Sequence, residues 1–366
     1  MKKILKTIFI NLIIMLVLLM IVDPFFKSQY DWQINRNINL REHPPSADLV
    51  YTPADSYIKV SDNLEQKAHK LRTDKNGYIL GPHEEYAPEK GIDIMFMGGS
   101  TTEYMYVDED KRFPYLVGAK LSESMPNGQI TTVNAGFPGN NSFHSTINIL
   151  AKGIKSNPRL VVLMHNINDL ATLTKSGNYW ITPQTRDIIL TQEPKNSMGA
   201  RFSGFWQSCQ NLIAPNLSRK IKRILSKNSG PVDEWGEEFE QKAYAIDLVK
   251  DKFEKSLMSF YQLAKANDLE VVLMTQSKRY DPKDEFIMKR HEYELIDYEE
   301  FCGRYAQLND LIRAFAEKNN ITLIDLDSLV PSTRTYIYDE VHLNTDGSEL
   351  VANLIAERLK TYFEAN

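Results

Sequence analysis

The stretch "DIMFMGGSTTEY", residues 93–104, carries an apolar run directly into two glycines and three hydroxyl residues. A near-continuous apolar run is typical of a strand that is covered on both faces, as the strands of a parallel sheet are. Two interpretations of the polar part stay open. It could be a tight turn followed by a helix N-cap, because glycine supplies positive φ and Ser or Thr caps helices. It could also present a nucleophile, Ser100, at the carboxyl edge of the sheet.

Apolar runs and helical segments alternate from this stretch to the C-terminus. Strands are expected at 92–97, 130–134, 160–164, 269–275 and 321–326. Helices are expected at 113–124, 146–155, 237–267, 298–319 and 348–363. Buried strands that alternate with helices predict an α/β fold, with a doubly wound parallel sheet between helical layers.

Polar residues follow four of the predicted elements at the edge where such sheets bind ligands. Ser100 stands in "GGSTTE", Gly136 in "NAGFPGNN" and Asn168 in "HNINDL". Asp339 and His342 stand three residues apart in "YDEVHLNTDG". These four segments, far apart in the sequence, are therefore expected to meet at one edge of the sheet.

These residue types are the ones that acyl transfer requires. A serine hydroxyl needs a base that takes its proton, the base needs an orienting carboxylate, and the oxyanion needs preset donors. We expect Ser100 to be the nucleophile, His342 the base and Asp339 the carboxylate. The N–H groups of Ser100 and Gly136 and the side-chain amide of Asn168 are the expected oxyanion donors.

The four blocks, in this order, resemble the SGNH or GDSL-type serine hydrolases. The resemblance covers residues 92–363 and implies a flavodoxin-like three-layer α/β/α sheet with esterase, lipase or acyl-transfer activity on ester-bearing lipids or carbohydrates. Two positions depart from the family's motifs. Gly99 stands where the family usually has Asp, and Asn166 stands where it usually has Gly. The "GGST" motif and "LRTDKNGYILGP" also resemble membrane-anchored relatives associated with surface polysaccharides.

Other polar residues near the predicted edge are candidate substrate contacts. His165 and Asn166 precede Asn168, and Gln276 and Arg279 follow the fourth predicted strand. A structural role or surface solvation is the alternative for each of them. No spacing of His, Cys or carboxylates predicts a metal site, and no cofactor is expected.

The N-terminus predicts a membrane anchor. Lys2, Lys3 and Lys6 precede the apolar run 7–22, which no small-residue cleavage site follows. We expect residues 1–6 in the cytoplasm, a signal anchor at 7–22, an extracytoplasmic stalk at 23–90 and the hydrolase domain at 91–366, with an insertion at about 174–235. The catalytic domain would then lie in the periplasm or at the cell surface.

The sequence thus predicts a membrane-anchored serine esterase that removes a small acyl group, acetyl, from a glycan. An O-acyltransferase with the same chemistry and a non-catalytic scaffold of polysaccharide assembly are the alternatives. The net charge of −5 gives no reason to expect a nucleic-acid partner. Pairing of Cys209 with Cys302 and the oligomeric state stay open.

Overall fold

In the computed structural model, the described residues are 2–22, 36–59, 61–82, 91–125, 128–180, 186–191, 243–280, 283–288 and 295–365. The chain divides into two compact units. The smaller unit comprises residues 1–39 and 183–234, and the larger comprises residues 40–182 and 235–366. All the candidate site residues belong to the larger unit.

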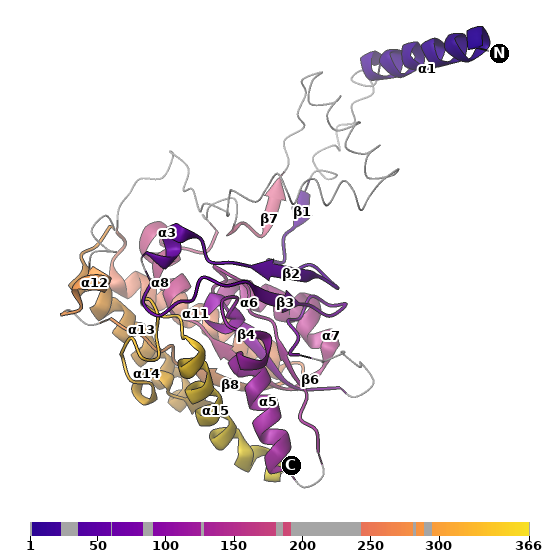
Figure 1. The fold of residues 1–366 in the computed structure, drawn as a ribbon. Coiled ribbons are helices and arrows are strands. Elements are labelled where there is room, and N and C mark those ends of the chain that lie inside the picture. The colour runs from indigo at the N-terminus through magenta and orange to yellow at the C-terminus, as the bar shows by residue number, and fades with distance from the viewer. Residues whose placement is uncertain are drawn as a thin grey trace. The chain divides into compact units, whose positions relative to one another are not determined.

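The larger unit is built on a five-stranded parallel sheet in the order β5-β4-β6-β8-β9 (Figure 1). Its strands are β4 (Ile92–Gly98), β5 (Thr132–Asn134), β6 (Pro158–Met164), β8 (Glu270–Met274) and β9 (Thr322–Ile324). The five predicted strands and their parallel arrangement are confirmed. Because β5 and β6 flank β4 on opposite sides, the chain changes direction at the carboxyl ends of β4 and β6. This is the crevice where open α/β sheets bind ligands.

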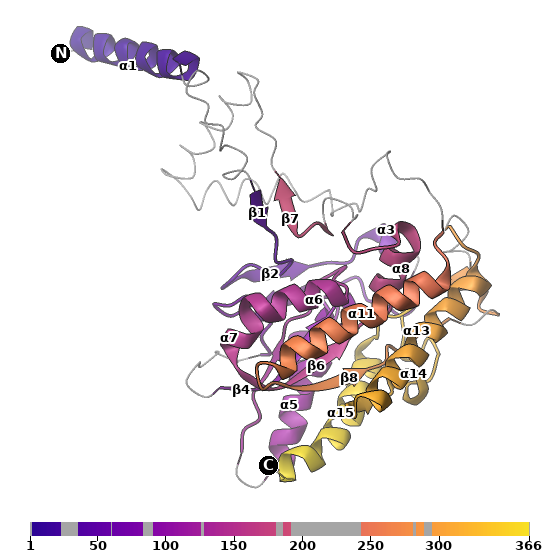
Figure 2. The same cartoon turned by 180° about the vertical axis from the view of Figure 1, so that it is seen from behind.

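Helices cover both faces of the sheet. On one face, Ile94 and Phe96 share an apolar core with α5 (Phe113–Ser124) and α15 (Thr345–Ala365), which lie side by side (Figure 1). On the other face, Met95 and Met97 share a core with three helices, shown in front in Figure 2: α8 (Ile167–Ser176), α11 (Ile246–Lys265) and α13 (Tyr298–Lys318). Since successive residues of a strand point to opposite faces, β4 is buried on both sides.

The predicted helices are found, three of them with shifted starts; the last, expected from 348, begins at Thr345 as α15. The segment expected at 146–155 begins earlier, as α6 (Ser142–Asn148), because the Asn141 side chain accepts a hydrogen bond from the N–H of His144 and caps it. It continues through a π-helical turn (Ile149–Gly153) into α7 (Ile154–Ser156). The helix expected at 237–267 begins at Ile246, and residues 237–242 lie outside the described residues.

Part of the predicted stalk packs on the larger unit. Strands β2 (Asp48–Tyr51) and β3 (His69–Arg72) form an antiparallel pair, with the short helix α3 (Asp55–Ile58) between them. We refer to the stalk residues of the larger unit, 40–90, as the lead-in. The N–H of Ile79 donates to the carbonyl of Asn134 over 2.8 Å, so the lead-in contacts the β5 edge of the main sheet. Most of the predicted insertion, at 181–185 and 192–242, lies outside the described residues.

The smaller unit contains α1 (Lys2–Val22) and an antiparallel pair of β1 (Arg36–Ile38) with β7 (Ile189–Thr191). Within the part of the chain that the structure describes, no helix has both the length and the apolar character needed to cross a membrane. The predicted membrane anchor is therefore not supported. Cys209 lies outside the described residues, so its pairing with Cys302 stays open.

Candidate active site

Ser100, His342 and Asp339 lie in one chain of hydrogen bonds. His342 Nε2 is 2.8 Å from Ser100 Oγ, and His342 Nδ1 is 2.7 Å from Asp339 Oδ2. Ser100 begins α4 (Ser100–Glu103) directly after β4, whereas His342 stands in the turn before α15. Both distances are within reach for proton transfer between the groups. The arrangement gives the serine hydroxyl a base and gives the base an orienting carboxylate.

The Asp339 carboxylate is buried and fully bonded. Its Oδ1 accepts from the N–H groups of Val341 and His342 at 2.9 and 2.8 Å. Its Oδ2 accepts from the hydroxyl of Tyr57 at 2.8 Å. Burial alone would raise the pKa of Asp339, but the charge and hydrogen bond of His342 and these N–H donors outweigh it and lower the pKa to about 2. Asp339 is therefore ionised throughout the neutral range.

The imidazole of His342 is held in position and tuned by its neighbours. The ring of Tyr338 stacks on it with centroids 5.7 Å apart and an interplanar angle of 11°. Burial lowers the pKa of His342, but the charge and hydrogen bond of Asp339 more than compensate and raise it above the ordinary 6.5. The charge of Asp339 thus makes the imidazole a stronger base, which favours removal of the proton from Ser100.

The predicted oxyanion donors are only partly placed as expected. The N–H of Gly136 donates to Asn134 Oδ1 over 2.9 Å, so it is already used. A Cβ on Gly136 would lie 2.5 Å from the N of Glu103, which shows that this glycine serves the close packing of its loop against α4. Gly139, in the same loop, has a φ of 71°, and its N–H has no acceptor among the described residues.

The side-chain amide of Asn168 lies beside the serine turn. One of its N–H groups donates to the carbonyl of Asn140 over 2.8 Å, which leaves the other for an oxyanion. A Cβ on Gly99 would lie only 2.4 Å from Asn168 Nδ2 and 3.0 Å from the Asn140 carbonyl oxygen. Gly99 is therefore needed for the close approach of this amide, which accounts for the departure from the Asp that the family usually has.

The residues that were expected to contact the substrate form contacts inside the protein instead. Arg279 is paired with Asp62 at 2.6 Å and Asp284 at 2.9 Å. Asn166 Nδ2 donates to the Tyr305 carbonyl over 3.0 Å. The four residues are all buried and bonded inside the protein, so we correct their assignment from substrate contacts to internal contacts: His165, Asn166, Gln276 and Arg279.

Gln276 joins the turns that carry Ser100 and Asn168. Its Nε2 donates to Thr101 Oγ1 over 2.6 Å, and its Oε1 accepts from the N–H of Ile167 over 2.9 Å. The backbone N–H of Ile167 can only donate, which fixes the orientation of the amide. Tyr305 adds a hydroxyl donor to Oε1 at 3.0 Å.

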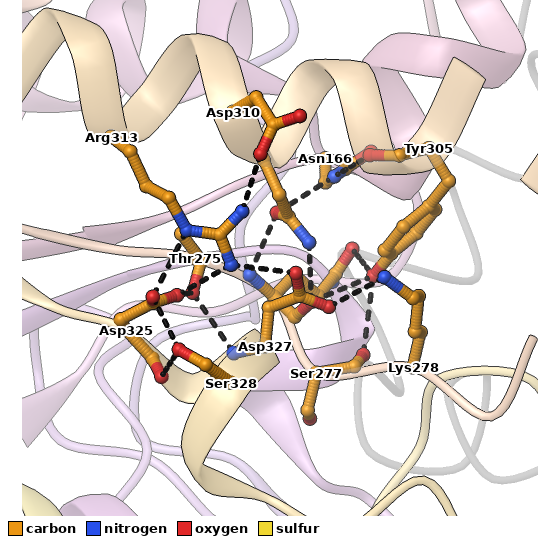
Figure 3. Close-up of polar contacts among 12 residues, drawn as sticks. Asn166, Thr275, Ser277, Lys278, Tyr305, Asp310, Arg313, Asp325, Asp327 and Ser328 are labelled. Atoms are coloured by element: carbon orange, nitrogen blue, oxygen red, sulfur yellow. Dashed lines mark hydrogen bonds and ion pairs between the residues drawn. The ribbon is translucent and has the colours of Figure 1, made fainter. Parts of the chain in front are cut away.

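The strand ends near Gln276 are also tied to α13 by charged groups (Figure 3). Arg313 binds both oxygens of Asp325, at 2.9 and 2.8 Å, and reaches Asp327 at 2.7 Å. Lys278 pairs with the other oxygen of Asp327 at 2.8 Å (Figure 3). Thr275, next to Gln276, donates to Asp325 over 2.7 Å. Together these contacts fix the position of the segment that carries Gln276.

A second set of Ser, His and Asp lies buried beneath the site. His165 Nε2 is 2.7 Å from Ser145 Oγ, and its Nδ1 is 3.7 Å from Asp169 Oδ2. Burial lowers the pKa of His165 to about 3 and raises that of Asp169 to about 6. Ser142 and Tyr179 donate their hydroxyls to Asp169, whose side chain is 0% exposed. Because this set is closed to substrate, it is structural and supports the first turn of α8.

A cavity of about 320 Å³ opens beside Ser100 and His342. Tyr57, from the lead-in, is part of its wall, a role that no motif in the sequence indicated. The apolar part of the wall comes from α8, α13 and the segments before α13 and before His342: Ile167, Ala171, Leu295, Ile296, Phe301 and Val341. Among the described residues, no group of three His, Cys, Asp or Glu side chains is arranged to hold a metal ion.

The fold and this geometry define a serine hydrolase. The model of the GDSL-like Lipase/Acylhydrolase family matches residues 96–350, and the chain belongs to this family. It is an enzyme that hydrolyses ester bonds. No curated protein matches it.

The solved structures that are similar to the chain share little sequence with it. A catalytic mutant of the acetylxylan esterase Axe2 from Geobacillus stearothermophilus is 15% identical, with 74% of this chain and 94% of that chain covered and a TM-score of 0.43. The acetyl xylan esterase AlAXEase is 17% identical, with coverages of 73% and 98% and a TM-score of 0.40. A GDSL-like lipase from Bacteroides thetaiotaomicron is 17% identical, with coverages of 75% and 90% and a TM-score of 0.39.

Proposed function

We propose that the protein removes a small acyl group, acetyl, from a glycan by acyl-enzyme chemistry. The observation that carries the proposal is the hydrogen-bonded chain from Ser100 through His342 to Asp339, which opens on the cavity described above. The apolar part of the wall suits the acyl methyl group, and the open part leaves room for a sugar.

The steps follow from the positions of the three side chains. Ser100 Oγ attacks the ester carbonyl while His342 Nε2 takes its proton. The N–H of Ser100 and the side-chain amide of Asn168 stabilise the oxyanion. His342 then gives the proton to the departing sugar oxygen, and a water molecule activated by the same imidazole hydrolyses the acyl-enzyme. Asp339 stays ionised and stabilises the imidazolium in both halves of the reaction.

A fluorophosphonate probe and a chromogenic ester test this proposal. We expect the wild-type protein to be labelled at Ser100 and to hydrolyse 4-nitrophenyl acetate, and Ser100→Ala to do neither. Equal labelling of the two proteins would favour the non-catalytic scaffold instead. Adding an excess of unacetylated glycan distinguishes an esterase from an O-acyltransferase. Formation of acetylated glycan together with faster release of 4-nitrophenol would show that the enzyme transfers the acetyl group and would contradict the esterase.

The extracytoplasmic location belongs to the same proposal. It is supported by the sequence alone, through Lys2, Lys3 and Lys6 before the apolar run 7–22. Fractionation of cells that express the full chain, with protease added to intact cells or spheroplasts, tests it. Protection of the hydrolase domain from protease until the cells are lysed would contradict this location.

A further inference from the structure

A second cavity, of about 380 Å³, lies next to the catalytic one. Its walls come from the lead-in around residues 63–69, from Tyr106, and from residues 334–346 near the start of α15. Tyr57 lines the catalytic cavity and Tyr106 lines the second, and their ring centroids are 5.6 Å apart. A polymer that leaves the catalytic cavity past Tyr57 would therefore meet Tyr106 next.

The charges around the second cavity balance. Lys67 and Arg334 contribute two positive side chains, and Glu65 and Asp346 contribute two negative ones. The remaining lining residues are amides, hydroxyls, an imidazole, a tyrosine and a leucine: Asn63, Leu64, His69, Tyr106, Thr335, Asn344 and Thr345. A cavity without net charge that is rich in polar groups suits a neutral polyhydroxylated ligand better than a polyanion.

His69 lies in the wall of this cavity with its imidazole almost fully buried. Its side chain is 3% exposed, and its Nδ1 pairs with Asp108 Oδ1 at 2.8 Å. Because an ionised carboxylate only accepts, Nδ1 carries the proton of the neutral ring, and Nε2 is an acceptor. Within the described residues Nε2 has no hydrogen-bond partner, which is unfavourable for a buried polar atom. Nε2 is itself buried, so a ligand hydroxyl would meet it only after a movement of the ring toward the cavity.

Tyr106 adds the apolar contact that a sugar ring uses. Its ring centroid lies 6.3 Å from that of His69, so the two rings lie together in the wall of the same cavity. Sugar rings expose apolar C–H faces and hydroxyl edges, and Tyr provides a broad apolar surface with a polar tip. Tyr106 thus matches the apolar face of a saccharide, and the amides and hydroxyls of the wall match its hydroxyl edge.

We propose that the second cavity is a binding subsite for a neutral sugar unit of the glycan, adjacent to the acylated unit held at Ser100. This inference rests on the glycan substrate proposed above. It extends that function by assigning the lead-in and Tyr106 to recognition of the polymer, away from the reacting ester.

Binding of non-acylated saccharides tests the subsite without catalysis. The Ser100→Ala protein is titrated by calorimetry with cellohexaose, xylohexaose and maltohexaose. We expect at least one to bind, and we expect Tyr106→Ala in the same background to weaken that binding by about tenfold. Tyr106→Phe keeps the ring and should bind as before. Tyr261→Ala, on α11 and outside both cavities, is the matched control and should leave saccharide binding unchanged.

A second variant covers the case in which Tyr106→Ala does not fold. Thr335→Trp places bulk in the second cavity from an exposed position and leaves Tyr106 and Tyr57 in place. It should abolish saccharide binding in the Ser100→Ala background. Absence of binding by all three hexasaccharides, or binding that neither cavity variant weakens, would overturn the subsite.

Acetylated forms of the bound hexasaccharide separate this inference from the proposed function. If the saccharide binds at Tyr106 but its acetylated form is not hydrolysed, the glycan esterase fails and the binding site stands. If the acetylated form is hydrolysed equally well by the wild type, Tyr106→Ala and Thr335→Trp, the esterase stands and the subsite fails.

Discussion

Gln276 Nε2 donates to Thr101 Oγ1 over 2.6 Å, and this contact joins the turn of the nucleophile to the turn of an oxyanion donor. The same amide accepts from the N–H of Ile167, the residue before Asn168. The backbone of Gln276 is fixed in turn by Asn309, which donates to its carbonyl over 3.0 Å. One buried side chain thus sets the separation between Ser100 and Asn168.

Replacing Gln276 by Leu should lower kcat and leave KM nearly unchanged, because both turns lose a shared anchor while the cavity keeps its wall. We expect a loss of about tenfold to a hundredfold, less than the 10²–10³ typical of deleting an oxyanion donor. Thr275→Val is the matched control. Thr275 is the neighbour of Gln276, but its hydroxyl donates to Asp325 and does not contact α4 or α8. This variant should cost stability and keep kcat.

A double-mutant cycle decides whether Gln276 acts through Asn168. In the Asn168→Ala background, the effect of Gln276→Leu on kcat should largely disappear, because no amide is left to position. Full additivity of the two effects would show that Gln276 has only a general structural role.

Gly99→Ala should lower kcat by about tenfold or more, although alanine is a small change. Its Cβ would meet Asn168 Nδ2 at 2.4 Å and push this amide out of place. Gly99→Asp, which restores the residue usual in the family, should be impaired in the same way. Steady-state kinetics on 4-nitrophenyl acetate checks both, with Gly128→Ala as control because a Cβ there meets no atom within 4 Å. Unchanged activity of Gly99→Asp would contradict the proposed approach of Asn168.

The pH dependence of activity should follow His342. Only its neutral form accepts the proton of Ser100, so kcat/KM should rise with pH through a pKa above 6.5. Asp339→Asn removes the charge that raises this pKa, and burial then lowers it. The ascending limb should therefore move to lower pH, while kcat falls by about 10⁴. A limb that stays in place in Asp339→Asn would show that another group titrates.

Asp169 and His165 should make stability depend on pH in opposite senses. The pKa of Asp169 is raised from 3.8 to about 6, so the folded protein holds the proton more tightly. Its contribution, about 3 kcal/mol in total, is fully present below pH 3.8 and is lost as the pH rises through 6. The pKa of His165 is lowered from 6.5 to about 3, so its contribution is present above pH 6.5 and is lost as the pH falls toward 3.

Asp169→Asn isolates the histidine contribution. Between pH 6 and pH 4 the wild type gains from Asp169 what it loses at His165, whereas the variant only loses. The free energy of unfolding, measured with urea at several pH values, should therefore fall more steeply with decreasing pH in Asp169→Asn. Parallel curves for the two proteins would contradict the raised pKa of Asp169.

The sequence by itself determined the sheet and predicted which groups would react. Apolar runs such as 92–97 and 160–164 report burial on both faces directly, because a strand inside a parallel sheet has no solvated side. The parallel arrangement places the carboxyl ends of these runs at one edge of the sheet. The sequence alone therefore predicts that Ser100 and Asn168 lie close together.

Only the tertiary structure decided which of the neighbouring polar residues face the substrate. Gln276 and Arg279 are residue types that often contact substrates. They are buried because α13 and the lead-in pack on them from distant parts of the chain. Tyr57 reaches Asp339 across 282 positions, and the N–H of Gly136 is used up by the hydrogen bond that it donates to the side chain of Asn134. The spacing of residues along a chain sets the end of a strand, whereas the direction of a side chain in a loop is set by whatever packs against it.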